Sequence, residues 1–316
     1  LGIPDPSVEI RGRDELCETF TALLERAASE RRVVCLIDAL NQLERTPSGM
    51  HSTWVPERWP ENARLIVTAI PGSETEGLLV RRPWIEALTL QLLTVSEVER
   101  IALVVAGRRR AEVRPELLAT LTARQTSAGT PAAGNPLWLE LALEAMLLLD
   151  ADDFARAEQL PGGTTEDRLH ALRLEMARRL PGDVEVLYAG LLERTEEVHG
   201  QRAAREFANL IAASRTGWRE SDLRALLPAR TGEPWDELRF AALRRGFRAH
   251  LVQRGAQEQW EFAHAQMREA VRTRDLPNPA VERELHAAIA DHLQALPPED
   301  ALRQTGLMHH LLRNGD

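Results

Sequence analysis

The chain has 316 residues, of which 44% are hydrophobic and 28% are charged, so it is long enough for one large domain or for two to three ordinary ones. Its net charge of -9 argues against a general nucleic-acid-binding surface. The two cysteines, Cys17 and Cys35, exclude a disulfide framework or a cysteine-rich zinc cluster, and no apolar run is long enough to cross a bilayer. We therefore expect a cytoplasmic chain with no membrane partner. Because it begins at Leu1, we also expect it to be a piece of a larger protein.

All 39 basic residues are arginine. The phosphate-binding lysine of a P-loop therefore does not exist in this chain, and chemistry that uses a lysine Schiff base is excluded.

The first part of the chain has the pattern of an α/β unit. Apolar spacing predicts an amphipathic helix over 13–30, and continuous aliphatic runs predict buried parallel strands at 33–37 and 64–70, with a shorter strand at 85–90. After Leu93 the strand pattern stops, and we expect helices at 96–106, 115–123, 135–149, 164–180 and 184–192. Thr164 and Asp167 resemble a capping box.

A second pattern follows in the C-terminal third. Three expected helices, at 203–213, 221–227 and 235–245, precede two strand-like runs, at 247–253 and 259–262. This is the order of a winged helix. Further helices are expected at 281–296 and 300–313.

Two polar side chains follow the first two expected strands. Asp38 is placed where a nucleotide-binding sheet holds Mg²⁺, and Thr68 is placed where it would sense a phosphate. Each has an ordinary alternative, since Asp38 also fits a helix cap and Thr68 a turn hydroxyl.

Two further residues belong to helix starts. Pro136 opens an apolar helix capped by Asn135, which would frame an adenine or simply fill a core. His264 stands at the corner between the second hairpin strand and the next helix, where a cap or a core histidine is the ordinary reading.

Four segments in this order resemble the STAND NTPases, the signalling branch of AAA+-like P-loop ATPases that includes NACHT proteins, and most of all the nephrocystin and telomerase-associated-protein type. The segments are Leu36-Ile37-Asp38-Ala39-Leu40-Asn41-Gln42-Leu43, Leu65-Ile66-Val67-Thr68-Ala69-Ile70-Pro71-Gly72, Gly134-Asn135-Pro136-Leu137-Trp138-Leu139 and Trp260-Glu261-Phe262-Ala263-His264. The resemblance implies that Asp38 is the Walker B carboxylate and metal ligand, Thr68 is sensor 1, Pro136 contacts adenine and His264 reaches the nucleotide phosphate.

The chain also departs from that family. Walker A is missing, and it belongs either between about Leu24 and Val33 or upstream of Leu1, since Gly12-Arg13 resembles the segment that precedes it. Asn41 and Gln42 are amides that cannot act as a general base, so hydrolysis should be slow. ATP or ADP with Mg²⁺ would be cofactors of the intact protein, and we expect this chain alone to be inactive and to bind nucleotide weakly or not at all.

The resulting prediction is an α/β part followed by a mostly α part. It comprises an incomplete P-loop nucleotide-binding domain at 1–93, a helical lid domain at 94–181, a winged helix at 182–275 and the start of a helical or repeat module at 276–316. The resemblance implies an ATP/ADP-dependent signalling switch that oligomerises with itself, carries an N-terminal effector and ends in a C-terminal repeat sensor. The alternatives are a winged-helix DNA-binding regulator, which the acidic residues near the expected helices weaken, and a nucleotide-free interaction scaffold.

Overall fold

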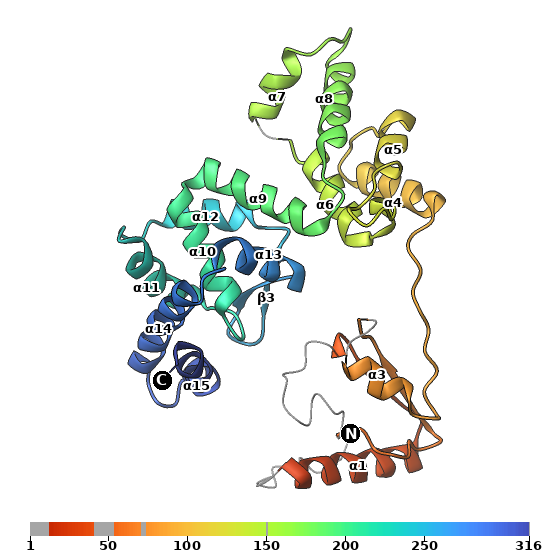
Figure 1. Ribbon diagram of the computed structural model, residues 1–316, viewed down its shortest axis with the longest axis vertical. Helices are drawn as coiled ribbons and strands as arrows, with labels where there is room; N and C mark the ends of the chain where they lie inside the picture. The colour runs from red at the N-terminus through yellow and green to blue at the C-terminus, as the bar shows by residue number, and fades with distance from the viewer. Residues whose placement is uncertain (1–12, 41–53, 71–73, 150, 316) are drawn as a thin grey trace. The chain divides into compact units, whose positions relative to one another are not determined.

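The computed structural model describes residues 13–40, 54–70, 74–149 and 151–315 (Figure 1). The chain divides into two compact units, Leu1–Gln91 and Leu92–Asp316, which we describe separately. Within the described ranges, no helix has the length and apolar character that a membrane crossing needs.

The first unit is a small sheet with helices. Its elements are α1 (Arg13–Glu30), β1 (Val33–Ile37), β2 (Ala63–Val67) and α3 (Glu74–Val80). β1 and β2 are parallel and in register from the pair Val33 and Ala63 to the pair Ile37 and Val67. Because side chains alternate along a strand, one face of this sheet packs on two small buried clusters around Leu24 and Leu40, and the other face is exposed.

The predicted fold class is wrong. The structure has fourteen α-helices in its described residues, and its strands form only two sheets of two strands each. The strand expected at 85–90 is absent, because that segment has neither helix nor strand. Two paired strands cannot make the doubly covered sheet of a P-loop domain, so a mostly helical fold replaces the α/β prediction.

The second unit begins with a group of short helices. They are α4 (Val95–Arg108), α5 (Pro115–Thr122), the 3₁₀ turn η2 (Ala132–Gly134), α6 (Pro136–Leu147), α7 (Ala151–Glu158) and α8 (Thr165–Arg179). The predicted capping box is confirmed, because Thr164 Oγ1 accepts a hydrogen bond from the Asp167 N–H while the Asp167 side chain accepts one from the backbone of Thr164.

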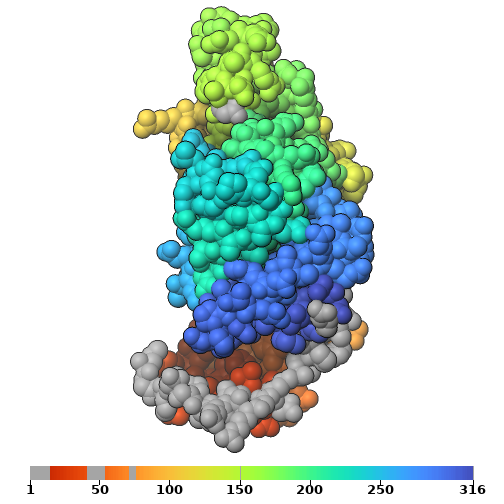
Figure 2. All heavy atoms as spheres, turned by 90° about the vertical axis from the view of Figure 1, so that its left-hand side faces the viewer, coloured from red at the N-terminus to blue at the C-terminus, as the bar shows by residue number. Residues whose placement is uncertain are grey.

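Longer helices and a hairpin complete this unit. They are α9 (Val184–His199), α10 (Gln201–Ala213), α11 (Glu220–Thr231), α12 (Glu237–Gly246), β3 (Leu251–Arg254), β4 (Gln259–Phe262), α13 (Ala265–Asp275), α14 (Pro279–Ala295) and α15 (Ala301–Asn314). β3 and β4 are antiparallel, so the expected order of three helices followed by a hairpin is present. Figure 2 shows α14 and α15 in blue against the cyan surface of the preceding helices.

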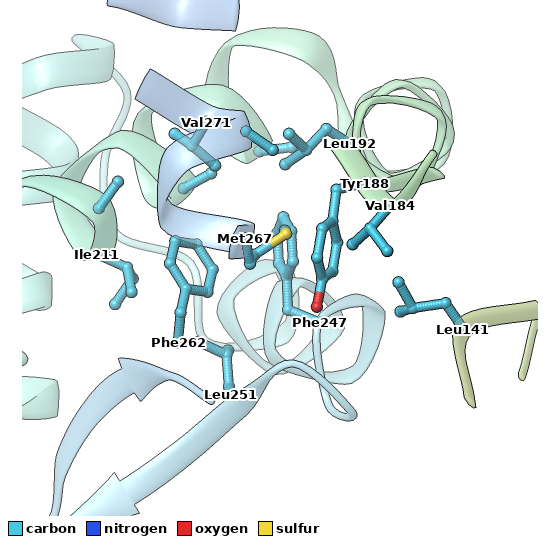
Figure 3. Packing of buried hydrophobic residues seen from close by; sticks show 14 of the residues in the cluster. Leu141, Val184, Tyr188, Leu192, Ile211, Phe247, Leu251, Phe262, Met267 and Val271 are labelled. Carbon is cyan, nitrogen blue, oxygen red and sulfur yellow. The ribbon is translucent and has the colours of Figure 1, made fainter. Parts of the chain in front are cut away.

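One buried cluster runs through the second unit, from Val98 in α4 to Leu302 in α15. Figure 3 shows its centre, where Phe247 packs together with Tyr188 of α9 and with Met267 of α13. Because this core is continuous, α4–α15 form one packed body rather than several separate domains. The predicted boundaries at 181 and 275 fall inside this core and stay predictions.

Candidate functional site

Asp38 and Thr68 lie side by side at the carboxyl ends of β1 and β2. Thr68 Oγ1 donates a hydrogen bond to Asp38 Oδ1 at 2.5 Å, and the N–H of Ala39 donates to Thr68 Oγ1 at 2.7 Å. Ala39 has a φ of 54°, an unusual left-handed conformation that turns the chain at this point. The parallel register therefore brings together two residues that are thirty positions apart.

The magnesium site that was predicted at Asp38 stays a prediction. Asp38 is a single exposed carboxylate, and one of its oxygens already accepts the Thr68 hydrogen bond. Among the residues that the structure describes, no group of three or more His, Cys, Asp or Glu side chains is arranged to hold a metal. The pair fits the ordinary role of closing two strand ends, and Asn41 and Gln42 lie outside the described residues.

Pro136 occupies the first position of α6, and Asn135 caps this helix by accepting a hydrogen bond from the Leu137 N–H at 2.9 Å. Pro136 is exposed, whereas Trp138 and Leu139 are buried. Trp138 Nε1 donates to the Pro181 carbonyl at 2.9 Å. The start of α6 is therefore built as a core helix with a conventional cap.

His264 is half-buried at the N-cap position of α13, and its side chain makes no cap hydrogen bond. It adjoins His250, whose carbonyl accepts a hydrogen bond from the Ala263 N–H at 2.8 Å. No hydrogen bond or ion pair joins Pro136 to His264 in the described part of the second unit. The structure therefore brings together Asp38 and Thr68 only, and the roles that the resemblance implied for all four residues stay predictions.

A buried polar junction that the sequence did not reveal links α6 to α9 and to the turn before β3. His250 Nε2 lies 3.7 Å from Glu144 Oε2. The His250 and Tyr188 rings pack edge to face, with their centroids 5.6 Å apart. Burial lowers the pKa of His250 to about 4, with a further contribution from His264. Burial also raises the pKa of Glu144. Because the His250 imidazole is neutral at pH 7, the two side chains do not form an ion pair of opposite charges there.

A second polar group fastens α14 and α15 to α11. His292 Nε2 lies 2.9 Å from Asp222 Oδ1, and Arg219 binds Asp222 at 2.7 and 3.1 Å and Asp300 at 2.8 Å. Burial alone would raise the pKa of Asp222, but the hydrogen bonds from His292 and Arg219 outweigh it and hold this pKa below its usual value. We call Arg219, Asp222, His292 and Asp300 the helix anchor.

The helix anchor had only a partial signal in the sequence. Arg219 and Asp222 are three residues apart, a spacing that brings side chains together on a helix. His292 and Asp300 are 70 and 81 residues away from their partners, and only the packing of α14 on α11 brings them close.

Comparison with known proteins finds one distant relative. The chain is 26% identical over 249 residues to a TPR repeat-containing protein of Dictyostelium discoideum. The match covers 75% of this chain and 13% of the relative. The chain thus spans about an eighth of the length of that protein. No family model matches the chain, and no solved structure matches it.

These findings correct the nucleotide-binding interpretation. A mostly helical chain with a TPR repeat-containing relative does not support the predicted assignment to STAND, NACHT or AAA+ P-loop NTPases, nor the predicted ATP binding. The expected ATP/ADP and Mg²⁺ cofactors of an intact protein stay untested.

Proposed function

We propose that this chain is a nucleotide-free protein-interaction scaffold within a larger protein. The observation that carries the proposal is the antiparallel helical hairpin α14–α15, which the helix anchor fixes to α11. The relative in Dictyostelium is described as repeat-containing, and stacked helical pairs of this kind present surfaces to partner proteins.

The packing of α14–α15 supports a rigid display of one face. Leu285, Ile289 and Leu293 of α14 are buried, and a Cβ on Gly306 of α15 would lie 3.2 Å from Leu293 Cδ1, so the helices approach closely. The opposite side of α15 exposes Met308 and Leu312, which are four residues apart on one helical face. Two apolar side chains on a well-anchored helix are a suitable contact for a partner protein.

The charge pattern weakens the alternative of DNA binding. Arg224 pairs with Glu220 and Glu237, and Arg239 pairs with Glu233. A phosphate backbone would have to displace these internal carboxylates, which lowers the attraction that a DNA-binding helix needs.

The experiment is affinity capture from cell extract with the 316-residue chain and two variants of equal charge change. Met308→Arg tests the exposed face of α15, and Leu238→Arg is the control, because Leu238 is an exposed aliphatic residue on α12. A scaffold that works through α15 retains a defined set of proteins with the wild type and the control and loses it with Met308→Arg. Identical capture by all three proteins would contradict the role of α15.

A nucleotide titration provides the second arm. Isothermal titration with Mg-ATP should give no binding tighter than about 10 μM, because the chain has no lysine to hold a triphosphate. Tighter binding would contradict a nucleotide-free scaffold.

A further inference from the structure

The C-terminal part of α15 depends on a histidine for its burial. The buried residues of this helix are Leu302, Gly306 and His310, so His310 is the only buried side chain that the structure describes beyond Gly306. Leu307 adds a partly buried contact with the core. Packing of residues 306–314 on the rest of the protein therefore depends chiefly on what His310 contacts.

The partner of His310 is a second buried histidine, His286 of α14, and we call these two residues the histidine pair. Their exposed fractions are 1% and 0%, and their Nδ1 atoms are 2.8 Å apart. One Nδ1–H donates to the other Nδ1, so one ring must keep its Nδ1 free of hydrogen. The bond that joins the two helices therefore requires that at least one ring is neutral.

The surroundings of the histidine pair are unfavourable to an added positive charge. The groups that oppose protonation are Arg272 on α13, Arg313 and His309 on α15, and Arg215 before α11. Glu282 is the carboxylate that acts in the other direction, and its Oε1 lies 3.8 Å from His286 Nε2, which is too far for a hydrogen bond. On α11, the carboxylate of Asp222 is already bound by the other members of the helix anchor. An added proton is therefore poorly compensated.

The rest of the α14–α15 hairpin is held by groups that keep their charge in mild acid. The contacts are Arg219 with Asp300 at 2.8 Å, Arg215 with the Thr305 carbonyl at 2.9 Å, and Arg230 with Glu284 at 3.1 Å. Arginine stays protonated throughout this range. Burial alone would raise the pKa of Asp300, but the hydrogen bond from Arg219 outweighs it and lowers this pKa. A proton on His292 would strengthen its contact with Asp222.

We infer that the histidine pair is an acid-sensitive switch, whose protonation releases residues 306–314 from α14 while α14 and the beginning of α15 stay attached to α11. The first proton places a positive charge among arginines. The second leaves a hydrogen on both Nδ1 atoms, so the two rings repel each other and separate into water. This switch is a property of the hairpin itself and is independent of the scaffold role proposed for α15.

The two rings together make the switch steep. Burial lowers the pKa of His286 to about 4 and that of His310 to about 3, whereas released rings titrate near the ordinary value of 6.5. Release is therefore favoured as the pH falls below 6.5. Between pH 7 and 5, each ring should raise the equilibrium constant for release by about twentyfold, and the pair by roughly several hundredfold.

The test is hydrogen exchange of the full chain at pH 7 and 5, corrected for the effect of pH on the chemical exchange rate. Protection of amides in 306–314 should fall by roughly several hundredfold, and it should stay below that of α11 at both pH values. Low urea concentrations should barely change exchange in 306–314, because a local opening exposes little surface. Protection of 306–314 that is independent of pH would overturn the proposal. So would protection equal to that of α11, because α15 would then separate only when the whole unit unfolds.

His310→Gln tests the pair directly. Glutamine keeps a donor for His286 Nδ1 but cannot gain a proton, so the fall in protection between pH 7 and 5 should shrink to about twentyfold. His286→Leu combined with His310→Leu should remove nearly all of it. Circular dichroism at pH 7 should confirm that these variants keep their helices, and the wild-type measurement tests the proposal without them. A His310→Gln protein that loses protection as steeply as wild type would overturn the proposal.

His199→Gln is the matched control. His199 ends α9, where burial lowers its pKa, and a Cβ on Gly246 of α12 would lie 3.1 Å from its Nε2. The variant removes a titrating imidazole from another part of the same unit, so the loss of protection in 306–314 should equal that of wild type. A loss that disappears in His199→Gln would show a general effect of acid on the unit and would overturn the proposal.

Discussion

His286 and His310 meet inside the α14–α15 hairpin, with their Nδ1 atoms 2.8 Å apart and both side chains buried. In this contact one ring donates and the other accepts, so the two neutral imidazoles adopt different tautomers. Burial lowers the pKa of His286 to about 4 and that of His310 to about 3, and in His310 the neighbouring His286 adds to the effect.

This pair should make stability depend on pH. The unfolded chain binds protons on these imidazoles below its ordinary histidine pKa of 6.5, whereas the folded chain binds them only near pH 4 and below. The free energy of unfolding should therefore fall as the pH drops from about 6.5 to 4, by about 2 kcal/mol for each histidine and about 4 kcal/mol for the pair between pH 7 and 5. Urea unfolding at both pH values measures this.

The control for the pH effect is a double variant. His286→Leu combined with His310→Leu should remove much of the loss at pH 5, and the part that stays is expected from His250. A double variant with the full wild-type loss would show that other groups are responsible.

The helix anchor gives a second prediction. Asp222→Ala leaves Arg219 and His292 without their shared, almost fully buried carboxylate, so the free energy of unfolding should fall by about 3–5 kcal/mol. Limited proteolysis should then cleave α14–α15 faster. Asp291→Ala is the control, because Asp291 is exposed on α14, and its effect should stay within about 0.5 kcal/mol. Equal effects of the two variants would show that the anchor does not hold the hairpin.

Local patterns of the sequence predicted helices and helix caps. They did not predict contacts between residues far apart in the sequence. The helix over 13–30, the Thr164–Asp167 box and the hairpin before α13 follow from spacing within a few residues. The predicted third strand depended on a neighbour strand that no local pattern supplies, and 85–90 is unpaired in the structure. The same limit hid the Glu144–His250 junction, whose members are joined only by tertiary packing.

The contact between Asp38 and Thr68 gives a third prediction. Thr68→Val keeps the branched shape but removes the hydroxyl that bonds Asp38 and the Ala39 N–H. The first unit should lose about 1–2 kcal/mol of stability, since two hydrogen bonds disappear at an exposed site. Hydrogen exchange of β1 and β2 amides measures the change. Thr68→Ser should retain most of the stability, and a loss as large as that of valine would point to packing rather than hydrogen bonding.

Tyr188 gives a fourth prediction. Its ring is buried between α6 and α9, and its hydroxyl has no hydrogen-bond partner among the described residues. Burial raises the pKa of this phenol, with contributions from Glu140 and Glu144, so the hydroxyl stays protonated. Tyr188→Phe removes an unsatisfied polar group and should leave stability unchanged or raise it by about 1 kcal/mol. Urea unfolding that instead shows a loss above about 1 kcal/mol would mean that the hydroxyl is hydrogen-bonded in solution.

Two glycines on either side of the start of α9 allow a matched comparison. A Cβ at Gly182 would lie 1.8 Å from the carbonyl oxygen of Gln125, a backbone atom that cannot move without displacing its own turn. Gly190 is in the interior of α9, is exposed, and has nothing within 4 Å of the added Cβ. Gly182→Ala should therefore destabilise the second unit by about 2–3 kcal/mol through overpacking. Gly190→Ala should stabilise it by about 1 kcal/mol, because alanine has the higher helix propensity. Thermal unfolding of both variants measures the difference, and a Gly182→Ala protein as stable as Gly190→Ala would show that the turn at Gln125 is not packed against Gly182 in solution.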